Sequence, residues 1–124
     1  MKTLTLLRHA KSSWTGGAKS DFQRPLDARG HKAARTVGRA LKSRGTRFDG
    51  VIASPTARVV ETIEAFADGY GSPIRPKLDE RVYLGSVATL LALVRDADDS
   101  ADRLLVVGHN PGVEGLALLL TCED

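Results

Sequence analysis

Short apolar runs alternate with longer amphipathic segments along the chain. Three of the runs have the length and the leucine and β-branched content of buried parallel strands: residues 3–7 (TLTLL), 50–54 (GVIAS) and 103–108 (RLLVVG). A weaker candidate is SPIRPKL at 72–78, where Pro73 and Pro76 suit only an edge strand, because proline cannot donate to a strand ladder.

Helical patterns lie between these strands. Asp27 is the expected N-cap and Gly45 the expected stop of one helix. Its apolar stripe, with the helical period, comprises Ala33, Ala34, Val37, Ala40 and Leu41. A second helix is expected to start at the cap Ser86, and its stripe comprises Val87, Leu90, Leu91 and Val94.

Two further segments, SPTARVVETIEAFA and NPGVEGLALLL, begin with a capping residue followed by proline. We expect Pro55 and Pro111 at the first helical position of these two helices. Strands that alternate with helices predict an α/β fold, with three layers (α/β/α) and a mainly parallel central sheet.

Composition adds limits to this picture. The chain has 124 residues, 42% hydrophobic and 27% charged, as is typical of one soluble globular domain. Its net charge of +3 comes from cations scattered between Lys2 and Arg103, and this excess suits a nucleic-acid face or a small anion such as phosphate equally well. Because only 5% of the residues are aromatic, base-stacking side chains are scarce, and we expect no nucleic-acid partner.

The sequence also bears on localisation. No window approaches the roughly 18 apolar residues of a membrane span, so we expect no membrane partner. The first residues, MKTLTLLRHA, have too short an apolar region, with charge inside it, for a secretory leader. The lone Cys122 cannot form an internal disulfide. We therefore expect a cytoplasmic protein.

Candidate chemistry follows the three confident strands. Just past them come Arg8–His9, the segment from Ser54 to Arg58, and Gly108–His109–Asn110. Open parallel sheets bind ligands at the carboxyl ends of their strands, so these residues are expected at one edge. Two of the segments also open into helices, whose N-terminal amides favour anions, and arginine forks match phosphate oxygens. The pattern predicts a site for a phosphoryl group.

Each feature alone also has an ordinary structural explanation, such as a solvated arginine or a hydrogen-bonded histidine, and only the joint placement indicates a site. A metal ion is the main alternative use of the two histidines. Zinc would need a third protein ligand, the neighbouring arginines would repel a dication, and His31 and Cys122 lie elsewhere in the sequence. We expect no metal.

Four motifs, LLRHAKS, RPLDARG, SPTARVVET and VVGHNPG, resemble in order and spacing the histidine phosphatase superfamily, whose fold is phosphoglycerate mutase-like. The short length and the pattern RHAKS…D..RPL..RG are most similar to its small SixA-type phosphohistidine phosphatases. The likeness covers residues 2 to about 120. It implies a single histidine phosphatase domain over residues 1–124 that needs neither a metal nor another cofactor.

The resemblance also implies the role of each matching position. His9 would be the nucleophile and would form a transient phosphohistidine that water hydrolyses. The positions expected to hold the phosphoryl oxygens are Arg8, Arg24, Arg58, His109, Asn110 and Ser12. An imidazole attacks only through an unprotonated nitrogen, and nearby positive charge disfavours the imidazolium form.

The chain departs from the family pattern in three places. Ala10 replaces the motif glycine after His9. The carboxylic acid that larger relatives use to protonate the leaving group is matched best by Glu80, with Asp21 as the alternative, although SixA-type enzymes lack a clear proton donor. Relatives continue with further sheet structure beyond the final LLLTCED, so we expect either a missing C-terminal segment, which we favour, or a minimal version with an exposed sheet edge.

The sequence does not decide which class of phosphorylated molecule is the substrate. The connections between motifs are short, and an uncovered site suits a phosphohistidine on a signalling protein. A small-molecule phosphomonoesterase and a phosphate-binding module without turnover are the alternatives. The roles of Lys11 and Trp14, in the loop after His9, stay open as well.

Overall fold

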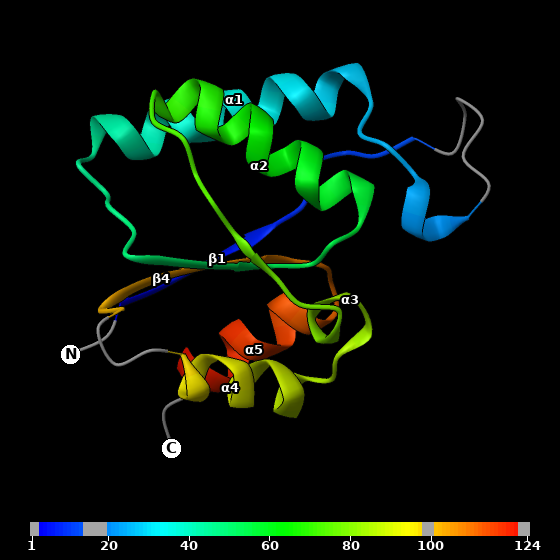
Figure 1. Cartoon of the computed structure of the whole chain (residues 1–124), viewed down its shortest axis with the longest axis vertical. Coiled ribbons are helices and arrows are strands. Elements are labelled where there is room, and N and C mark those ends of the chain that lie inside the picture. Colours follow the sequence, from blue (N-terminus) through cyan, green and yellow to red (C-terminus); the bar gives the residue numbers. More distant parts are fainter. Residues whose placement is uncertain (1–2, 14–19, 98–100, 122–124) are drawn as a thin grey trace. The chain divides into compact units, whose positions relative to one another are not determined.

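The computed structural model describes residues 3–13, 20–97 and 101–121. The chain divides into two compact units (Figure 1). The sheet unit comprises Met1–Arg8, Phe48–Ser54 and Pro76–Asp124, and the helix unit comprises His9–Arg47 and Pro55–Arg75. The chain therefore passes from one unit to the other directly after Arg8 and directly after Ser54.

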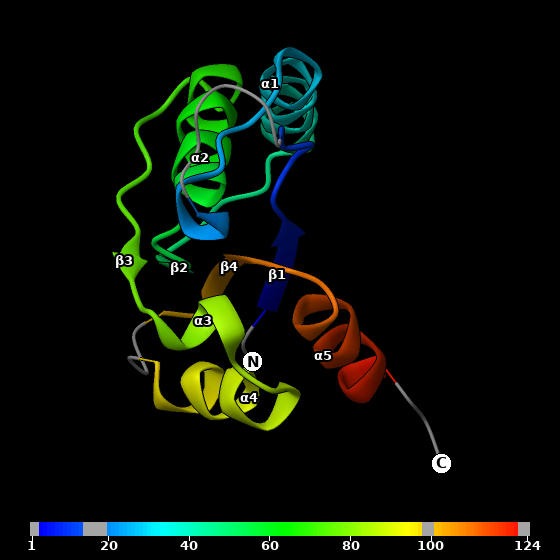
Figure 2. The same ribbon diagram turned by 90° about the vertical axis from the view of Figure 1, so that its right-hand side faces the viewer.

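The sheet unit contains one parallel sheet. Its strands are β1 (Thr3–Arg8), β2 (Gly50–Ala53), β3 (Lys77–Leu78) and β4 (Arg103–Gly108), in the order β1-β4-β2-β3 (Figure 2). The three confident strand predictions are confirmed to within one residue. The weak fourth candidate shrinks to its last two residues and lies at the sheet edge, as its prolines required. The α/β class and the parallel sheet are confirmed.

Three helices of the same unit are α3 (Arg81–Leu84), α4 (Val87–Asp96) and α5 (Gly112–Thr121). Figure 1 shows α4 and α5 on one face of the sheet. The core there joins Ile52, Leu104 and Val106 from the strands to buried leucines of the two helices, Leu90, Leu93 and Leu116. Leu93 lies outside the predicted stripe of α4, whose Leu90 is buried and whose Val87, Leu91 and Val94 are partly buried.

The helix unit contains a short 3-10 helix, η1 (Asp21–Gln23), and two helices that pack side by side, α1 (Ala28–Ser43) and α2 (Ala57–Tyr70). The predicted apolar stripe of α1 is wrong in part, because Val37 is 37% exposed and Ala33 and Ala40 are exposed too. The buried face of α1 consists instead of Gly30, Ala34 and Gly38. Small residues, rather than large apolar ones, let this helix approach its neighbours.

Helix ends follow the predictions only in part. Asp27 caps α1 by accepting from the Gly30 amide at 2.7 Å, and Ser86 caps α4 by accepting from the Thr89 amide at 3.2 Å. Gly45, just past α1, has the positive φ of 73° that suits a stop. The predicted starts of α2 and α5 at a proline are wrong, since the helices begin two residues after Pro55 and one residue after Pro111.

Strand pairing explains the later start of α2. The Ser54 amide still donates to the Val107 carbonyl oxygen at 3.1 Å, so the chain is still tied to the sheet at this point. Pro55 and Thr56 then make the turn, and Thr56 is the N-cap of the helix. At α5 the expected cap still acts, since Asn110 Oδ1 accepts from the Glu114 amide at 3.1 Å.

Gly38→Ala should destabilise the protein strongly. A Cβ at this position would lie 2.1 Å from the Phe66 carbonyl oxygen, so α1 and α2 would have to separate. We expect a loss of about 1–3 kcal/mol in the free energy of unfolding, measured by denaturant titration. The control is Thr36→Ala, at an exposed position of the same helix. Equal stability of the two variants would contradict the close packing described above.

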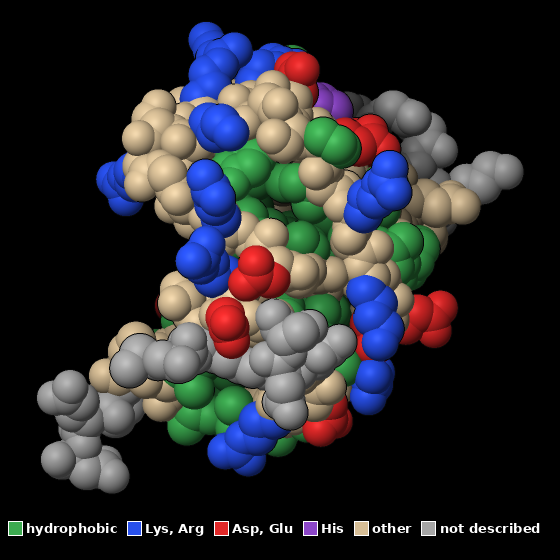
Figure 3. All heavy atoms as spheres, turned by 60° about the vertical axis from the view of Figure 1, so that its left-hand side comes forward, with side chains coloured by type: hydrophobic (Ala, Val, Ile, Leu, Met, Phe, Trp, Pro, Cys, Tyr) green, Lys and Arg blue, Asp and Glu red, His purple; other side chains and the backbone are tan. Residues whose placement is uncertain are grey.

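Two surface features complete the fold. Among the described residues, no helix has the length and apolar character needed to cross a membrane. On the face shown in Figure 3, Lys and Arg side chains occur at several places, with Asp and Glu side chains among them.

Candidate active site

The carboxyl edge of the sheet brings together residues from three strands. Strand β4 lies between β1 and β2, with Arg8 paired to Gly108 in the register and the Ser54 amide bonded to Val107. His109 follows β4 directly. Arg8, Ser54 and His109 therefore stand at neighbouring strand ends, about 5 Å apart from strand to strand. The register thus places Arg8 and His109 at neighbouring strand ends, as the sequence predicts, while their joint contact with a phosphoryl group stays a prediction.

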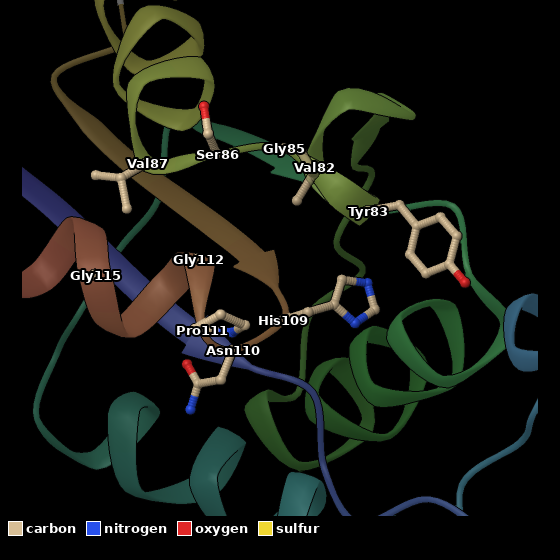
Figure 4. A pocket seen from close by; sticks show the side chains of 10 residues that line it. All are labelled: Val82, Tyr83, Gly85, Ser86, Val87, His109, Asn110, Pro111, Gly112 and Gly115. Carbon is tan, nitrogen blue, oxygen red and sulfur yellow. The ribbon is translucent and has the colours of Figure 1, made fainter.

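The His109 ring is held by two neighbours. It is 9% exposed, and its Nε2 lies 2.8 Å from Oγ of Ser54, which is fully buried. The Tyr83 ring meets the imidazole edge-on, with the ring centroids 5.4 Å apart (Figure 4). Glycine at 108 keeps this strand end close to α3, since a Cβ would lie 2.9 Å from Val82. The orientation of the imidazole is thus fixed by the fold.

Glu80, the predicted proton donor, is an exposed residue at the start of α3. Its neighbours on both sides form an ion pair, with Arg81 Nη2 2.7 Å from Asp79 Oδ2. The hydrogen bonds from Arg81 lower the pKa of Asp79 to about 2. Asp79 becomes protonated only as the pH falls through that value, so the pair that flanks Glu80 stays charged at neutral pH.

The helix unit contains the predicted nucleophile. His9 Nδ1 lies 2.7 Å from the Ala10 carbonyl oxygen. A carbonyl oxygen can only accept, so Nδ1 carries the proton, and in the neutral ring Nε2 keeps its lone pair. The Ala10 amide donates to Thr62 Oγ1 at 3.0 Å, and this hydroxyl donates to the Arg58 carbonyl oxygen at 2.6 Å. The backbone that carries His9 is therefore tied to α2.

Two predicted phosphate-binding arginines of the helix unit converge on one acidic residue. Arg58 is only 4% exposed, and it donates from Nη1 to the backbone oxygen of Asp21 at 2.6 Å and from Nη2 to its carboxylate at 3.0 Å. Arg24 lies 3.6 Å from the same carboxylate. Asp21, the alternative proton donor, thus accepts hydrogen bonds from Arg58 and forms a longer ion pair with Arg24.

The loop after His9 packs against the segment that precedes α1. Ser12 forms a β-bridge with Leu26, and the Asp27 amide donates to the Lys11 carbonyl oxygen at 3.0 Å. Gly30 makes room for this loop, because a Cβ there would lie 2.2 Å from that oxygen. The phosphate contact expected of Ser12 stays a prediction, as does that of Asn110, whose side chain caps α5.

Other residues singled out in the sequence lie elsewhere. His31, on α1, is 3.4 Å from Glu61 and belongs to the helix surface. Trp14 and Cys122 fall outside the described residues. Within the part of the chain that the structure describes, no three His, Cys, Asp or Glu residues gather as a metal site would require.

The sequence pattern assigns no individual role to three residues that position the site side chains. Ser54 is predicted to lie at the ligand edge, since it directly follows a strand, but its contact with His109 is not predicted. Thr62 stands four residues after Arg58 on the same helix and so shares its face. Tyr83 has no such signal, because its contact with His109 depends on the short helix α3, which the pattern does not predict.

A parallel α/β sheet whose carboxyl edge carries Arg8 and the buried His109 is an arrangement that can bind an anion. Residues 4–84 match the model of the histidine phosphatase superfamily (branch 1). The chain belongs to this family.

Relatives and solved structures agree with this membership. An uncharacterized protein of Mycobacterium tuberculosis is 33% identical over 114 residues, which cover 92% of this chain and 69% of that protein. A candidate SixA phosphohistidine phosphatase from Agrobacterium tumefaciens is 28% identical with a TM-score of 0.87, covering 98% of this chain and 77% of that one.

Two more solved structures extend the likeness. The protein histidine phosphatase SixA complexed with tungstate is 25% identical with a TM-score of 0.84, over 93% of this chain and 74% of that one. A phosphoglycerate mutase from Bacillus anthracis shares the fold, at 15% identity, a TM-score of 0.76, and coverage of 97% of this chain and 80% of that one. The fold is phosphoglycerate mutase-like, and by family and structural likeness the chain is a phosphatase.

Proposed function

We propose that the chain hydrolyses a phosphoryl group through a phosphohistidine intermediate on His9, and that its substrate is a protein phosphohistidine, as in SixA-type enzymes. The observation that carries this proposal is the hydrogen bond from His9 Nδ1 to the Ala10 carbonyl oxygen, which makes Nε2 the nitrogen that holds the lone pair in the neutral ring and can attack phosphorus. The likeness to SixA structures supports the substrate class.

The reaction takes two displacements. The lone pair of His9 Nε2 forms a bond to phosphorus while the bond from phosphorus to the leaving nitrogen breaks, and the released imidazole takes up a proton. Water then attacks phosphorus, the bond to Nε2 breaks, phosphate leaves, and the proton lost by the water passes to solvent. Arg8, Arg58 and His109 are proposed to hold the phosphoryl oxygens, with Arg24, Asn110 and Ser12 as further contacts.

Cationic groups suit this reaction physically. Phosphoryl transfer passes through a loose transition state whose charge is spread over the phosphoryl oxygens, so catalysis depends on positioning and electrostatic stabilisation. Arg58 is already held by hydrogen bonds from Nη1 and Nη2 to Asp21, and a guanidinium has five N–H donors in all, so one group can hold both Asp21 and phosphoryl oxygens. Little reorganisation is then needed when the phosphoryl group binds.

A substrate panel tests the proposal. Purified protein in EDTA is offered a phosphohistidine protein, phenyl phosphate, a sugar phosphate and a nucleotide, and phosphate release is measured. We expect turnover without added metal and the highest kcat/KM for the phosphohistidine protein. Higher kcat/KM for a sugar phosphate or nucleotide would contradict the substrate class, and loss of all turnover in EDTA would contradict the metal-free mechanism.

Glu80→Gln should separate substrates by their leaving groups. Imidazole leaves readily, whereas a phenolate benefits from protonation, and a general acid contributes about 100-fold or more. We expect phenyl phosphate hydrolysis to fall by about that factor and phosphohistidine hydrolysis to change by less than about threefold. Glu114→Gln, at another exposed carboxylate, is the control. Equal losses on both substrates would exclude Glu80 as the acid.

Ser54→Ala should affect turnover through His109. The variant leaves the imidazole without its buried hydroxyl partner, and the lost hydrogen bond is worth about 1–3 kcal/mol. We expect kcat to fall about tenfold with KM nearly unchanged, because the imidazole is no longer held in one orientation. Thr36→Ala, which removes an exposed hydroxyl of α1, is the control and should change neither constant. A loss in KM alone, or no loss in kcat, in a folded Ser54→Ala variant would refute this positioning role.

A further inference from the structure

A hollow of about 470 Å³ opens beside His109 within the sheet unit (Figure 4). One wall comes from α3 and the start of α4, with Val82, Tyr83 and Val87. The opposite wall comes from the residues that follow His109, including Pro111 and the first turns of α5. The volume exceeds that of a single aromatic side chain and lies in the range of small-molecule sites.

The walls of this hollow are mostly apolar. Among the described residues that line it there is no Lys, Arg, Asp or Glu, and His109 is the one ionisable imidazole. The uncharged polar groups of the lining side chains are those of Ser86, Asn110 and the Tyr83 hydroxyl. A charged or many-hydroxyl group placed here would leave polar atoms unsatisfied, which costs free energy, whereas an uncharged ring would bury apolar surface.

Two glycines of α5, Gly112 and Gly115, leave the α5 wall of the hollow without side chains. A Cβ at Gly115 would lie 2.6 Å from a methyl group of Val87, and a Cβ at Gly112 would lie 3.0 Å from Leu90. Helix α5 therefore approaches α4 with backbone rather than side chains at these points. The hollow is bounded by fixed backbone and by Val87, so its width depends on the size of the side chain at position 87.

We propose that this hollow binds the leaving group of the phosphoryl donor and selects an uncharged aromatic ring. The inference rests on the proposed function, which assigns the phosphoryl oxygens to His109. A ring bonded to that phosphorus would then lie beside His109, which lines the hollow. The edge-on contact of Tyr83 with His109 shows that the site already accommodates ring–ring packing. The imidazole of phosphohistidine and the ring of an aryl phosphate share this chemistry.

Filling the hollow should separate ring donors from a donor without a ring. Val87→Phe, and the milder Val87→Leu, narrow it from the α4 side, and Ala92→Phe adds the same ring at an exposed position of α4 as a control. Three donors are compared: phosphoramidate, 1-naphthyl phosphate and a phosphohistidine peptide. We expect kcat/KM for the ring donors to fall about tenfold, mainly through KM, while phosphoramidate hydrolysis is unchanged.

Each outcome decides the question. If kcat/KM falls for both ring donors in the Val87 variants, the hollow binds the imidazole of a phosphohistidine peptide as well as the ring of a free aryl phosphate. If kcat/KM falls for 1-naphthyl phosphate alone, the hollow binds only the ring of free aryl phosphates. Equal changes for all three donors, or no change with a folded variant, would overturn the inference. Binding of 1-naphthol, measured by its fluorescence, needs no turnover. If wild-type protein binds 1-naphthol, the Val87 variants bind it more weakly and no donor is hydrolysed, the assignment of the hollow to an aromatic ring is correct and the proposed function is wrong.

Discussion

Replacing His9 with alanine is expected to abolish phosphatase activity, with a loss of at least about ten-thousand-fold in kcat. The variant removes the nitrogen that forms the covalent intermediate in the proposed two-step displacement. Because His9 is half-buried and its ring contacts its own loop, we expect the fold to persist. Phosphate release from phenyl phosphate and from a phosphohistidine peptide measures the loss, and thermal melting checks the fold.

The matched control is His31→Ala, which removes a histidine of the same unit. His31 lies on α1 beside Glu61, in a partly exposed pair that contributes little to stability. This variant should keep its kcat within about twofold. Retained activity in His9→Ala would exclude His9 as the nucleophile, and an equal loss in both variants would point to damaged folding.

Arg58→Lys is expected to lower kcat/KM by about 100- to 1000-fold although the positive charge is kept. The guanidinium is 4% exposed and uses two of its nitrogens to hold Asp21, so its remaining edge is fixed in direction. A lysine ammonium cannot hold Asp21 and two phosphoryl oxygens in the same planar arrangement. Kinetics with phenyl phosphate, together with the inhibition constant of inorganic phosphate, measure the change.

Arg35→Lys provides the comparison for this variant. Arg35 forms an exposed pair with Asp68 at 2.8 Å, in the same helix unit. We expect no change in kcat/KM for this variant. An exposed ion pair contributes little to stability, and neither Arg35 nor Asp68 is a candidate site residue. If Arg58→Lys retained both its activity and its affinity for phosphate, charge alone would be sufficient, and the proposed oxygen contacts of the guanidinium would be wrong.

The sequence predicts the sheet unit well. Apolar strands with parallel pairing have a strong local signal, and the rule that ligands bind at the carboxyl ends places Arg8 and His109 at one edge. The exception is β3, whose prolines leave only Lys77 and Leu78 for pairing. The local hydrophobic pattern is thus sufficient to predict a strand where the strand is a continuous apolar run.

The helix unit is predicted less well, because its contacts are not visible in local pattern. Gly38 and Gly30 are the close-packing positions of α1, yet glycine adds nothing to an apolar stripe. Arg58 and Asp21 are 37 positions apart in the sequence, so their hydrogen bonds depend on tertiary structure. The bond between Ser54 and His109 joins residues 55 positions apart in the same way. The residues that position the site side chains are therefore identified by the structure and not by the sequence pattern.

The most direct test of the central claim is to trap the phosphorylated enzyme. Protein mixed with a phosphohistidine peptide is quenched with alkali within milliseconds, because phosphohistidine is stable to base, and the modified peptide is mapped by mass spectrometry. A phosphoryl group on His9, absent from the His9→Ala variant and unaffected by EDTA, is the predicted result. Steady turnover by wild-type protein with no phosphoryl group on His9, or with the group on another residue, would contradict the mechanism proposed for this chain.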